Sequence, residues 1–277
     1  MVLKSFSKIN LTLNVNKKLK NNFHDIQSYY CQINLYDSIK IRKINGHGDK
    51  VKFLGKFKKL IDNKNNSVLD TLKFLRKNKI ISSYFSVIID KKIPVYSGLG
   101  GGTGNAITIF KHFIKKKDNK MINSLCKFIG TDSRLFFYNQ GFLKNLNSVI
   151  KLKKQHKFYF LLIYPNIKSP TKMIYSKVRH FSRKIRYNAN FTKNKRLFEN
   201  YLKLQKNDLQ LIVENKHLAL KKIIAEIYNN KGCAFSRMTG SGSVCYGMFQ
   251  SKKLAKKALN KLSIKYSRYW MCVAKTI

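Results

Sequence analysis

A cluster of glycines between two apolar segments constrains this chain more than any other feature. Residues 85–89 form a strand-like apolar run, and residues 106–114 form a helix-like run. Glycine lets the backbone approach a ligand closely and adopt positive φ angles. The N–H groups at the start of a helix also attract anions. The segment therefore predicts a phosphate-binding loop, and the alternative is a flexible surface turn. Its glycines are Gly98, Gly100, Gly101, Gly102 and Gly104.

Two common nucleotide motifs do not describe this loop. No Gly-Lys-Ser/Thr follows it, which excludes a Walker A loop. A Gly-x-Gly-x-x-Gly fingerprint that starts at Gly98 requires a glycine at its sixth position, and Thr103 occupies that position.

Length and composition set broader bounds. A chain of 277 residues, 44% of them hydrophobic, suits one large domain or two smaller ones. The longest apolar run, residues 158–164, is too short to span a bilayer, and the first eight residues lack the apolar stretch of a signal peptide. Five scattered cysteines without Cys-x-x-Cys spacing indicate reduced thiols and no metal site. We expect a cytoplasmic protein with no membrane partner.

The formal net charge of +45 has two explanations. Such a field attracts phosphate backbones, as in nucleic-acid-binding proteins. However, 48 of the 57 basic residues are lysines spread over the whole chain, and Asn, Ile, Phe and Tyr are also abundant. These residue types share A/T-rich codons, so genome composition explains the charge better. We therefore expect weak anion binding and no specific nucleic-acid partner.

Hydrophobic periodicity predicts an α+β fold. Strands are expected within residues 6–15, 29–44, 85–89, 158–164, 244–249 and 269–274. Helices are expected at 68–77 with Asn66 or Ser67 as N-cap, at 106–114, 120–129, 251–262, and over 197–225 with a break near 206–208. A second glycine loop occupies residues 237–243, and a Lys-rich stretch at 150–157 is the best domain boundary.

Three segments carry a resemblance to a known family. They are residues 7–13 (SKINLTL), residues 93–106 with the glycine loop, and residues 236–243 (SRMTGSGS). In this order they resemble the GHMP small-molecule kinases, and most closely the kinases that act on 4-diphosphocytidyl-2-C-methyl-D-erythritol in the non-mevalonate isoprenoid pathway. Shorter matches at residues 22–24, 35–37, 66–68, 130–132 and 170–171 extend the resemblance over nearly the whole chain.

The resemblance implies a two-lobed fold and a reaction. Residues 1–152 would form an N-terminal lobe like ribosomal protein S5 domain 2, and residues 153–277 an α/β sandwich. The enzyme would transfer the γ-phosphoryl group of ATP, with Mg²⁺, to the 2-hydroxyl of the cytidyl-diphosphate substrate. Such a transfer asks the protein mainly for positioning and charge stabilisation. The implied partners are small molecules, and the chain would be a monomer or a homodimer.

Two residues match the chemical roles of the family. Asp132, in Gly130-Thr131-Asp132, stands where the family carries its proposed base, and Lys8 stands where it carries a cation. Without the resemblance, Asp132 reads as a turn or cap residue and Lys8 as a solvated side chain.

The binding residues implied by the resemblance fall into two sets. No separate metal-binding set is assigned, although Thr103 could offer its hydroxyl to a phosphate or to Mg²⁺. The ATP set is Asn66, Pro94, Ser97, Gly98, Leu99, Gly100, Gly101, Gly102, Thr103, Gly104 and Asn105. The substrate set is Asn10, Phe23, His24, Tyr30, Thr171, Tyr175, Gly240, Ser241 and Gly242. Tyr30 and Tyr175 are expected to sandwich the base, although aromatic residues taken singly are more often part of a core.

The chain departs from the family pattern at three places. Thr103-Gly104 replaces the usual Ser-Ser, Asn21-Asn22-Phe23-His24 replaces Asp-Gly-Tyr-His, and Arg134 replaces a proline after Asp132. None of these removes a predicted catalytic residue. Two other functions stay open: a nucleic-acid-binding protein on an S5-like scaffold, and a GHMP kinase for another alcohol such as homoserine or mevalonate. The Lys8-Ile-Asn-Leu opening with Phe23-His24 argues against the second.

Overall fold

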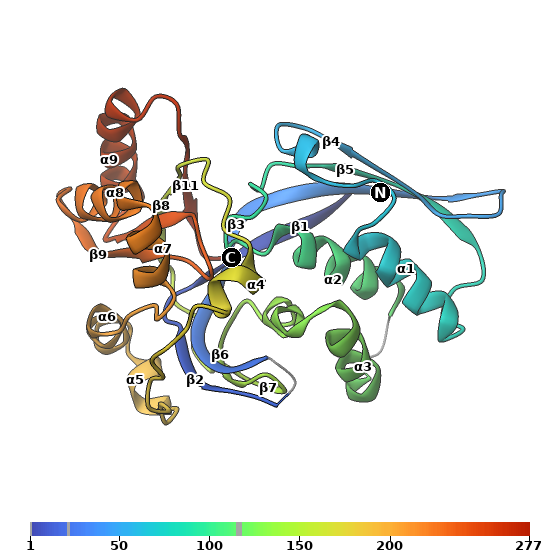
Figure 1. The fold of residues 1–277 in the computed structure, drawn as a ribbon, viewed down its shortest axis with the longest axis horizontal. Coiled ribbons are helices and arrows are strands. Elements are labelled where there is room, and N and C mark those ends of the chain that lie inside the picture. The colour runs from blue at the N-terminus through green and yellow to red at the C-terminus, as the bar shows by residue number, and fades with distance from the viewer. Residues whose placement is uncertain (1, 21–22, 115–117) are drawn as a thin grey trace. The chain divides into compact units, whose positions relative to one another are not determined.

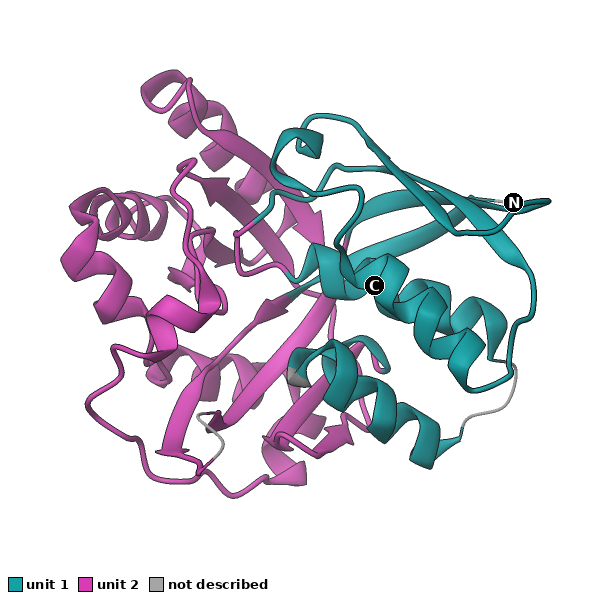
Figure 2. Ribbon diagram, turned by 45° about the vertical axis from the view of Figure 1, so that its right-hand side comes forward, with its two compact units in different colours: residues 1–8, 35–95, 100–137 teal, residues 9–34, 96–99, 138–277 magenta. Residues whose placement is uncertain are grey.

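The computed structural model describes residues 2–20, 23–114 and 118–277 (Figure 1). Asn21 and Asn22, which belong to one of the departures, lie outside the described residues. Two compact units interleave along the chain (Figure 2). Unit 1 comprises Met1–Lys8, Leu35–Val95 and Gly100–Phe137, and unit 2 comprises Ile9–Asn34, Tyr96–Leu99 and Tyr138–Ile277. The predicted lobes, residues 1–152 and 153–277, stay a prediction, because these units do not follow a single cut in the chain.

Unit 1 combines a small sheet with three helices. Its elements are most of β1 (Val2–Asn10), the second part of β3 (His24–Ile44), β4 (Lys50–Leu54), η1 (Lys58–Leu60), α1 (Ser67–Lys77), β5 (Tyr84–Asp90), α2 (Gly101–Phe113), α3 (Asn119–Ile129) and η2 (Thr131–Phe136). Residues 38–44 of β3 pair antiparallel with β5, and β4 pairs parallel with β5. Helices α1 and α2 pack side by side, and each buries an apolar face (Figure 1).

Unit 2 contains a group of strands that pairs with the first part of β3, and a separate sheet of four strands. Its strands are β2 (Asn14–Lys18), β6 (Gln140–Asn145), β7 (Ser148–Lys151), β8 (Tyr159–Tyr164), β9 (Cys233–Met238), β10 (Cys245–Phe249) and β11 (Trp270–Lys275). Its helices are α4 (Thr171–Tyr175), α5 (Ala189–Lys193), α6 (Lys195–Leu204), α7 (Gln210–Lys216), α8 (Leu218–Tyr228) and α9 (Lys252–Lys265). The second sheet is antiparallel in the order β11-β8-β10-β9, and α8 and α9 pack on it.

Local sequence explains where several helices begin. Asn66 caps α1, since its side chain accepts hydrogen bonds from the N–H groups of Val68 and Leu69. Asp118 caps α3 in the same way, and Ser251 caps α9. The predicted helices at residues 68–77, 120–129 and 251–262 are therefore confirmed, each to within three residues.

Three expectations about elements were wrong in detail. The single strand expected at residues 6–15 is two strands, because the N–H groups of Leu11 and Thr12 both donate to the carbonyl of Tyr29 at 2.7 and 3.2 Å and interrupt the ladder. The helical region at 197–225 is three helices, although the expected break near 206–208 is present. The helix expected from residue 106 begins at Gly101.

Two further observations on the described residues concern membrane spans and cysteines. No helix among them is long and apolar enough to cross a membrane. The five cysteines are free thiols.

Candidate active site

The glycine loop is a turn that leads directly into the first turn of α2. Gly98 and Gly100 have φ angles of 78° and 70°, in the left-handed region that favours glycine. Gly100 is the N-cap of α2 and supplies no side-chain hydrogen bond to it. The N–H groups of residues 101–103 thus open a helix without a side-chain cap, which is the arrangement that attracts an anion.

Close packing surrounds this helix start within unit 1. A Cβ atom on Gly101 would lie 2.9 Å from Cγ2 of Ile93, and one on Gly100 would lie 2.8 Å from the ring of Phe136. The hydroxyl of Ser67 donates to the carbonyl of Gly102. Asn105 is buried, and its side-chain oxygen finds no hydrogen-bond partner among the described residues. The start of α2 therefore combines a backbone cradle with one unsatisfied amide oxygen.

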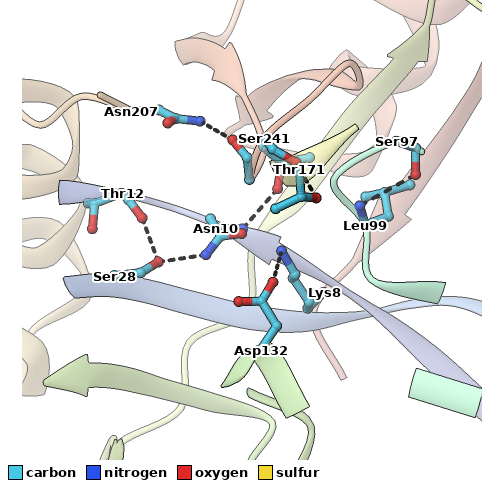
Figure 3. Close-up of polar contacts among 12 residues, drawn as sticks. Lys8, Asn10, Thr12, Ser28, Ser97, Leu99, Asp132, Thr171, Asn207 and Ser241 are labelled. Atoms are coloured by element: carbon cyan, nitrogen blue, oxygen red, sulfur yellow. Dashed lines mark hydrogen bonds and ion pairs between the residues drawn. The ribbon is translucent and has the colours of Figure 1, made fainter. Parts of the chain in front are cut away.

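Lys8 and Asp132 meet beside the same helix start (Figure 3). The ammonium of Lys8 lies 3.8 Å from Oδ2 of Asp132. The Lys8 side chain is 2% exposed, whereas that of Asp132 is 47% exposed. The Cε atom of Lys8 also lies 3.2 Å from the place a Cβ on Gly100 would take. The two predicted catalytic residues are thus brought together, with a buried cation and an accessible carboxylate.

Burial governs the titration of Lys8. Desolvation lowers the pKa of its ammonium below the usual 10.5, and the negative charge of Asp132 opposes this shift. In its protonated form the ammonium of Lys8 is a compact positive charge. Such a charge is suited to interact with the negative oxygens of a phosphoryl group.

The segment that presents Asp132 is anchored despite its departure from the family. Asp132 lies in η2, and the neighbouring Arg134 donates to the side-chain oxygen of Asn123 on α3 at 2.8 Å. Lys111 of α2 donates to the carbonyl of Phe136 at the end of η2. Arg134 therefore attaches η2 to α3, in a position where the family has a proline.

In unit 2, Asn10 belongs to a buried hydrogen-bond chain (Figure 3). Its amide donates to the hydroxyl of Ser28 at 2.8 Å, and Ser28 donates to the carbonyl of Thr12. The backbone N–H of Asn10 donates to the hydroxyl of Thr239 at 3.0 Å. These bonds fix the orientation of Asn10 and connect it to the second glycine loop.

His24 and Tyr175 form an aromatic pair in unit 2. Their ring centroids lie 5.2 Å apart, and the ring of Phe181 stacks on that of His24 with a centroid distance of 6.4 Å. Burial lowers the pKa of His24, and the charge of Lys18 lowers it further, so the imidazole is neutral at pH 7. Phe23 and Phe181 are both about half exposed. The structure thus brings two aromatic side chains, Tyr175 and Phe181, against His24.

Tyr30 does not fit the stacking role predicted for it. The residue is fully buried, and its hydroxyl has no hydrogen-bond partner among the described residues. A Cβ on Gly141 would lie only 2.8 Å from that hydroxyl, which shows how closely β6 packs on the ring. The ring has no face open to a base, so Tyr30 is a core residue here.

The second glycine loop is fastened by polar side chains. Gly240 and Gly242 have φ angles of 56° and 87°. Asn207 donates to the carbonyls of Met238 and Gly240, each at 2.8 Å, and the hydroxyls of Thr171 and Ser241 lie 3.0 Å apart. Thr171 and Ser241 from the predicted substrate set are thereby brought together (Figure 3).

Several residues of the predicted binding sets make hydrogen bonds to neighbouring backbone. The side chain of Asn66 caps α1 and also donates to the carbonyls of Asp62 and Asn63, so its adenine role stays a prediction. The hydroxyl of Ser97 accepts from the N–H of Leu99 at 3.4 Å, and the carbonyl of Ser97 accepts from the N–H of Val244 at 3.1 Å, within unit 2. Sequence reasoning missed Asn207 and Phe181. Asn207 was visible only as part of a helix break, and Phe181 carried no signal in the sequence.

Comparisons with known proteins agree on one family. Residues 189–268 match the protein family described as GHMP kinases C terminal. The 4-diphosphocytidyl-2-C-methyl-D-erythritol kinase of Pelagibacter ubique is 37% identical, over 99% of this chain and 98% of its own length. The enzyme of the same name from Prochlorococcus marinus (strain MIT 9301) is 30% identical over 98% of this chain and 94% of its own.

Solved structures agree with this at the level of the fold. A crystal structure of 4-(cytidine 5′-diphospho)-2C-methyl-D-erythritol kinase matches with a TM-score of 0.76 and 18% identity, over the full length of both chains. A homoserine kinase from Cytophaga hutchinsonii matches with a TM-score of 0.68 and 14% identity, over 100% of this chain and 94% of its own. The mixed α/β fold is therefore that of the GHMP kinases. With a relative 37% identical over nearly its whole length, this chain belongs to the 4-diphosphocytidyl-2-C-methyl-D-erythritol kinase family.

Proposed function

We propose that this chain transfers the γ-phosphoryl group of ATP to the 2-hydroxyl of 4-diphosphocytidyl-2-C-methyl-D-erythritol, a step in the supply of isoprenoid precursors. The observation that carries the proposal is the pair of Lys8 and Asp132, 3.8 Å apart beside the uncapped start of α2. The acceptor is taken from the names of the relatives, which cover nearly the whole chain. The five free cysteines fit the reducing cytoplasm in which such a pathway would run.

In this proposal unit 1 supplies the groups for phosphoryl transfer. The N–H groups of residues 101–103 hold phosphate oxygens of ATP at the start of α2. Lys8 places a positive charge where negative charge accumulates, and Asp132 accepts the proton of the attacking hydroxyl. The hydroxyl oxygen forms a bond to the γ-phosphorus while the bond to the β-phosphate oxygen breaks, and ADP leaves.

The residues at the helix start fit Mg²⁺-bound ATP. Asn105 offers an unsatisfied amide oxygen, and Thr103 offers a hydroxyl in the same turn of helix. Mg²⁺ binds oxygen ligands and usually reaches proteins together with phosphates. Its contribution when bound is to neutralise charge on the phosphate oxygens.

Unit 2 supplies the groups for the cytidine end of the acceptor. Tyr175 offers a ring on which cytosine can stack, a contact worth ~1–3 kcal/mol. Neutral His24, 5.2 Å from that ring, can donate one hydrogen bond and accept another, and the edge of cytosine presents both kinds of group. Asn10 is already oriented by Ser28 and belongs to the same predicted set.

Steady-state kinetics with a panel of acceptors tests the proposal. The cytidyl-diphosphate acceptor should be used best, and bare 2-C-methylerythritol very poorly, because the remote cytidine supplies binding energy that positions the hydroxyl. Homoserine and mevalonate should not be phosphorylated. Preferred phosphorylation of either one, or equal use of the cytidyl and uridyl forms, would contradict the acceptor proposed here.

A further inference from the structure

A second lysine–aspartate pair lies at the end of β5 in unit 1. Lys91 directly follows β5, and its ammonium forms an ion pair with Oδ2 of Asp37 on β3. The side chains are 2% and 0% exposed. Neither residue belongs to the sets implied by the family motifs. The pair is therefore an ionic group inside the core that the proposed chemistry does not use.

The other carboxylate oxygen of Asp37, Oδ1, binds the backbone of the two residues that follow Lys91. Oδ1 accepts hydrogen bonds from the N–H groups of Lys92 at 2.8 Å and Ile93 at 2.9 Å. The N–H of Lys91 itself donates to the carbonyl of Leu54 at 2.9 Å. One carboxylate thus holds three donors from three consecutive residues, at the point where the chain leaves β5 and enters the glycine loop.

Two of these residues also touch the start of α2. A Cβ on Gly101 would lie 3.1 Å from the ammonium of Lys91 and 2.9 Å from Cγ2 of Ile93. Gly101 is the first residue of α2, and only a glycine leaves room for both neighbours. The position of Asp37 therefore determines the position of Lys91 and Ile93, and these two define one wall of the helix start.

We propose that Asp37 and Lys91 are positioning residues for the phosphate-binding start of α2. They do not contact ATP; they hold residues 91–93 so that the N–H groups of α2 are correctly placed before ATP arrives. Stability alone does not explain the pair, since replacing a buried ion pair with apolar residues is often neutral or stabilising. The inference rests on the proposed function, because it assumes that ATP phosphates bind at the start of α2.

The chain contains a matched pair at the opposite end of β5. Asp49 accepts two hydrogen bonds from Arg76, at 2.9 and 3.0 Å, and one from the N–H of Phe85 at 2.8 Å. Arg76 also donates to the carbonyl of Ser83. This pair has the same kind of chemistry, a carboxylate bound by a cation and by backbone, but it holds the beginning of β5 and not the loop.

Two double variants separate positioning from general stability. Asp37→Asn with Lys91→Met removes both charges together and leaves neither partner alone in the core. We expect KM for ATP to rise about 10- to 100-fold, as misplacement of binding groups does, with kcat and KM for the acceptor changed less than about threefold. Asp49→Asn with Arg76→Met should leave KM for ATP within about twofold, whatever change in melting temperature either double variant shows.

Several outcomes overturn the inference. An unchanged KM for ATP in the Asp37/Lys91 variant would make the pair purely structural, and an equal rise in the Asp49/Arg76 variant would make the effect one of general destabilisation. If the first double variant does not fold, Ile93→Ala keeps both charges paired, removes the methyl group that faces Gly101, and is judged by the same split between KM and kcat.

A third variant distinguishes this inference from the proposed function. Gly101→Val places side-chain atoms against Ile93 and Lys91 at the helix start itself. If Gly101→Val loses ATP binding while the Asp37/Lys91 variant keeps it, only the present inference fails. If Gly101→Val binds ATP normally, the phosphate site itself is elsewhere and the proposed function loses its main support.

Discussion

At the scale of single residues, Lys8 and Asp132 differ strongly in how far their side chains are exposed to solvent. The carboxylate is nearly half exposed and can exchange protons with a bound hydroxyl, while the ammonium is buried. A buried cation opposite an accessible base is useful for phosphoryl transfer, because charge stabilisation and proton acceptance are assigned to different groups.

The first prediction concerns Asp132. Asp132→Asn should lower kcat by about 10²–10⁴, as removal of a general base typically does, and should leave ATP affinity nearly unchanged. Single-turnover phosphorylation and equilibrium binding of ATP measure the two effects separately. Turnover within threefold of the parent would remove Asp132 from the mechanism.

The second prediction concerns the stability of Lys8. Lys8→Met should abolish turnover but raise the free energy of unfolding by ~1–3 kcal/mol, since the buried charge is removed and Asp132 remains partly solvated. Burial lowers the pKa of Lys8, so the cost of its charge is fully present below the folded-state pKa. The gain should therefore shrink as the pH rises from that pKa towards 10.5. Urea unfolding at several pH values measures this, and a variant less stable than the parent at every pH would contradict it.

Residue roles were only partly predictable from sequence. The motifs pointed to Lys8, Asn10 and Asp132 as site residues, but only the structure shows that the ammonium of Lys8 lies 3.8 Å from the carboxylate of Asp132. Tyr30 was assigned to the substrate set from the family resemblance alone, and the structure buries it because β3 is buried on both sides over residues 24–33. Phe181 lies in an irregular segment, where no periodic pattern marks it.

At the scale of elements, the start of α2 shows why glycine-rich helices are missed. Glycine disfavours a helix interior by about 0.5–1 kcal/mol relative to alanine, so the sequence suggested a helix only from residue 106. In the structure the helix includes Gly101, Gly102 and Gly104, because its apolar residues Ile107 and Phe110 are buried. Tertiary packing therefore overrides local propensity in this turn. Elsewhere a polar cap such as Asn66 agreed with the periodicity, and the boundaries were predicted well.

The third prediction explains one departure from the family. A Cβ on Gly104 would lie 3.0 Å from the ring of Phe136, 3.1 Å from the carbonyl oxygen of Phe6 and 3.2 Å from the hydroxyl of Ser5. Gly104→Ala should therefore destabilise the protein by ~1–3 kcal/mol through overpacking.

Gly102 provides the control for this change. A Cβ there would meet only the hydroxyl of Ser67, at 3.8 Å. Gly102→Ala should be neutral or stabilising by about 0.5 kcal/mol, because alanine favours a helix more than glycine does. Denaturant unfolding of both variants gives the comparison, and equal effects at the two positions would mean that packing does not select glycine at position 104.

At the scale of the whole molecule, the formal net charge of +45 bears on whether the protein binds nucleic acids. Lysines stand on most helices and strands of both units, which is the distribution expected from composition and not from one recognition surface. The fourth prediction is that RNA and DNA bind weakly, without sequence preference, and that affinity falls steeply with salt as counterion release requires. Titrations between ~50 and ~200 mM salt measure this slope. Tight, sequence-selective binding at the higher salt would support the nucleic-acid alternative.

The interleaving of the two units has a consequence for synthesis on the ribosome. Every segment of unit 1 has been translated once residue 137 is made, whereas β8, β10 and β11 of unit 2 are encoded later. Residues 9–34, which belong to unit 2, are therefore made long before residues 138–277, which contain most of that unit. At ~5–20 residues per second this interval lasts roughly 7 to 28 s, during which Tyr29 lacks the rings that contact it in the structure, those of Phe142, Tyr187, Phe198 and Tyr201. We therefore expect the nascent chain to be most prone to aggregation while the later part of unit 2 is still being made.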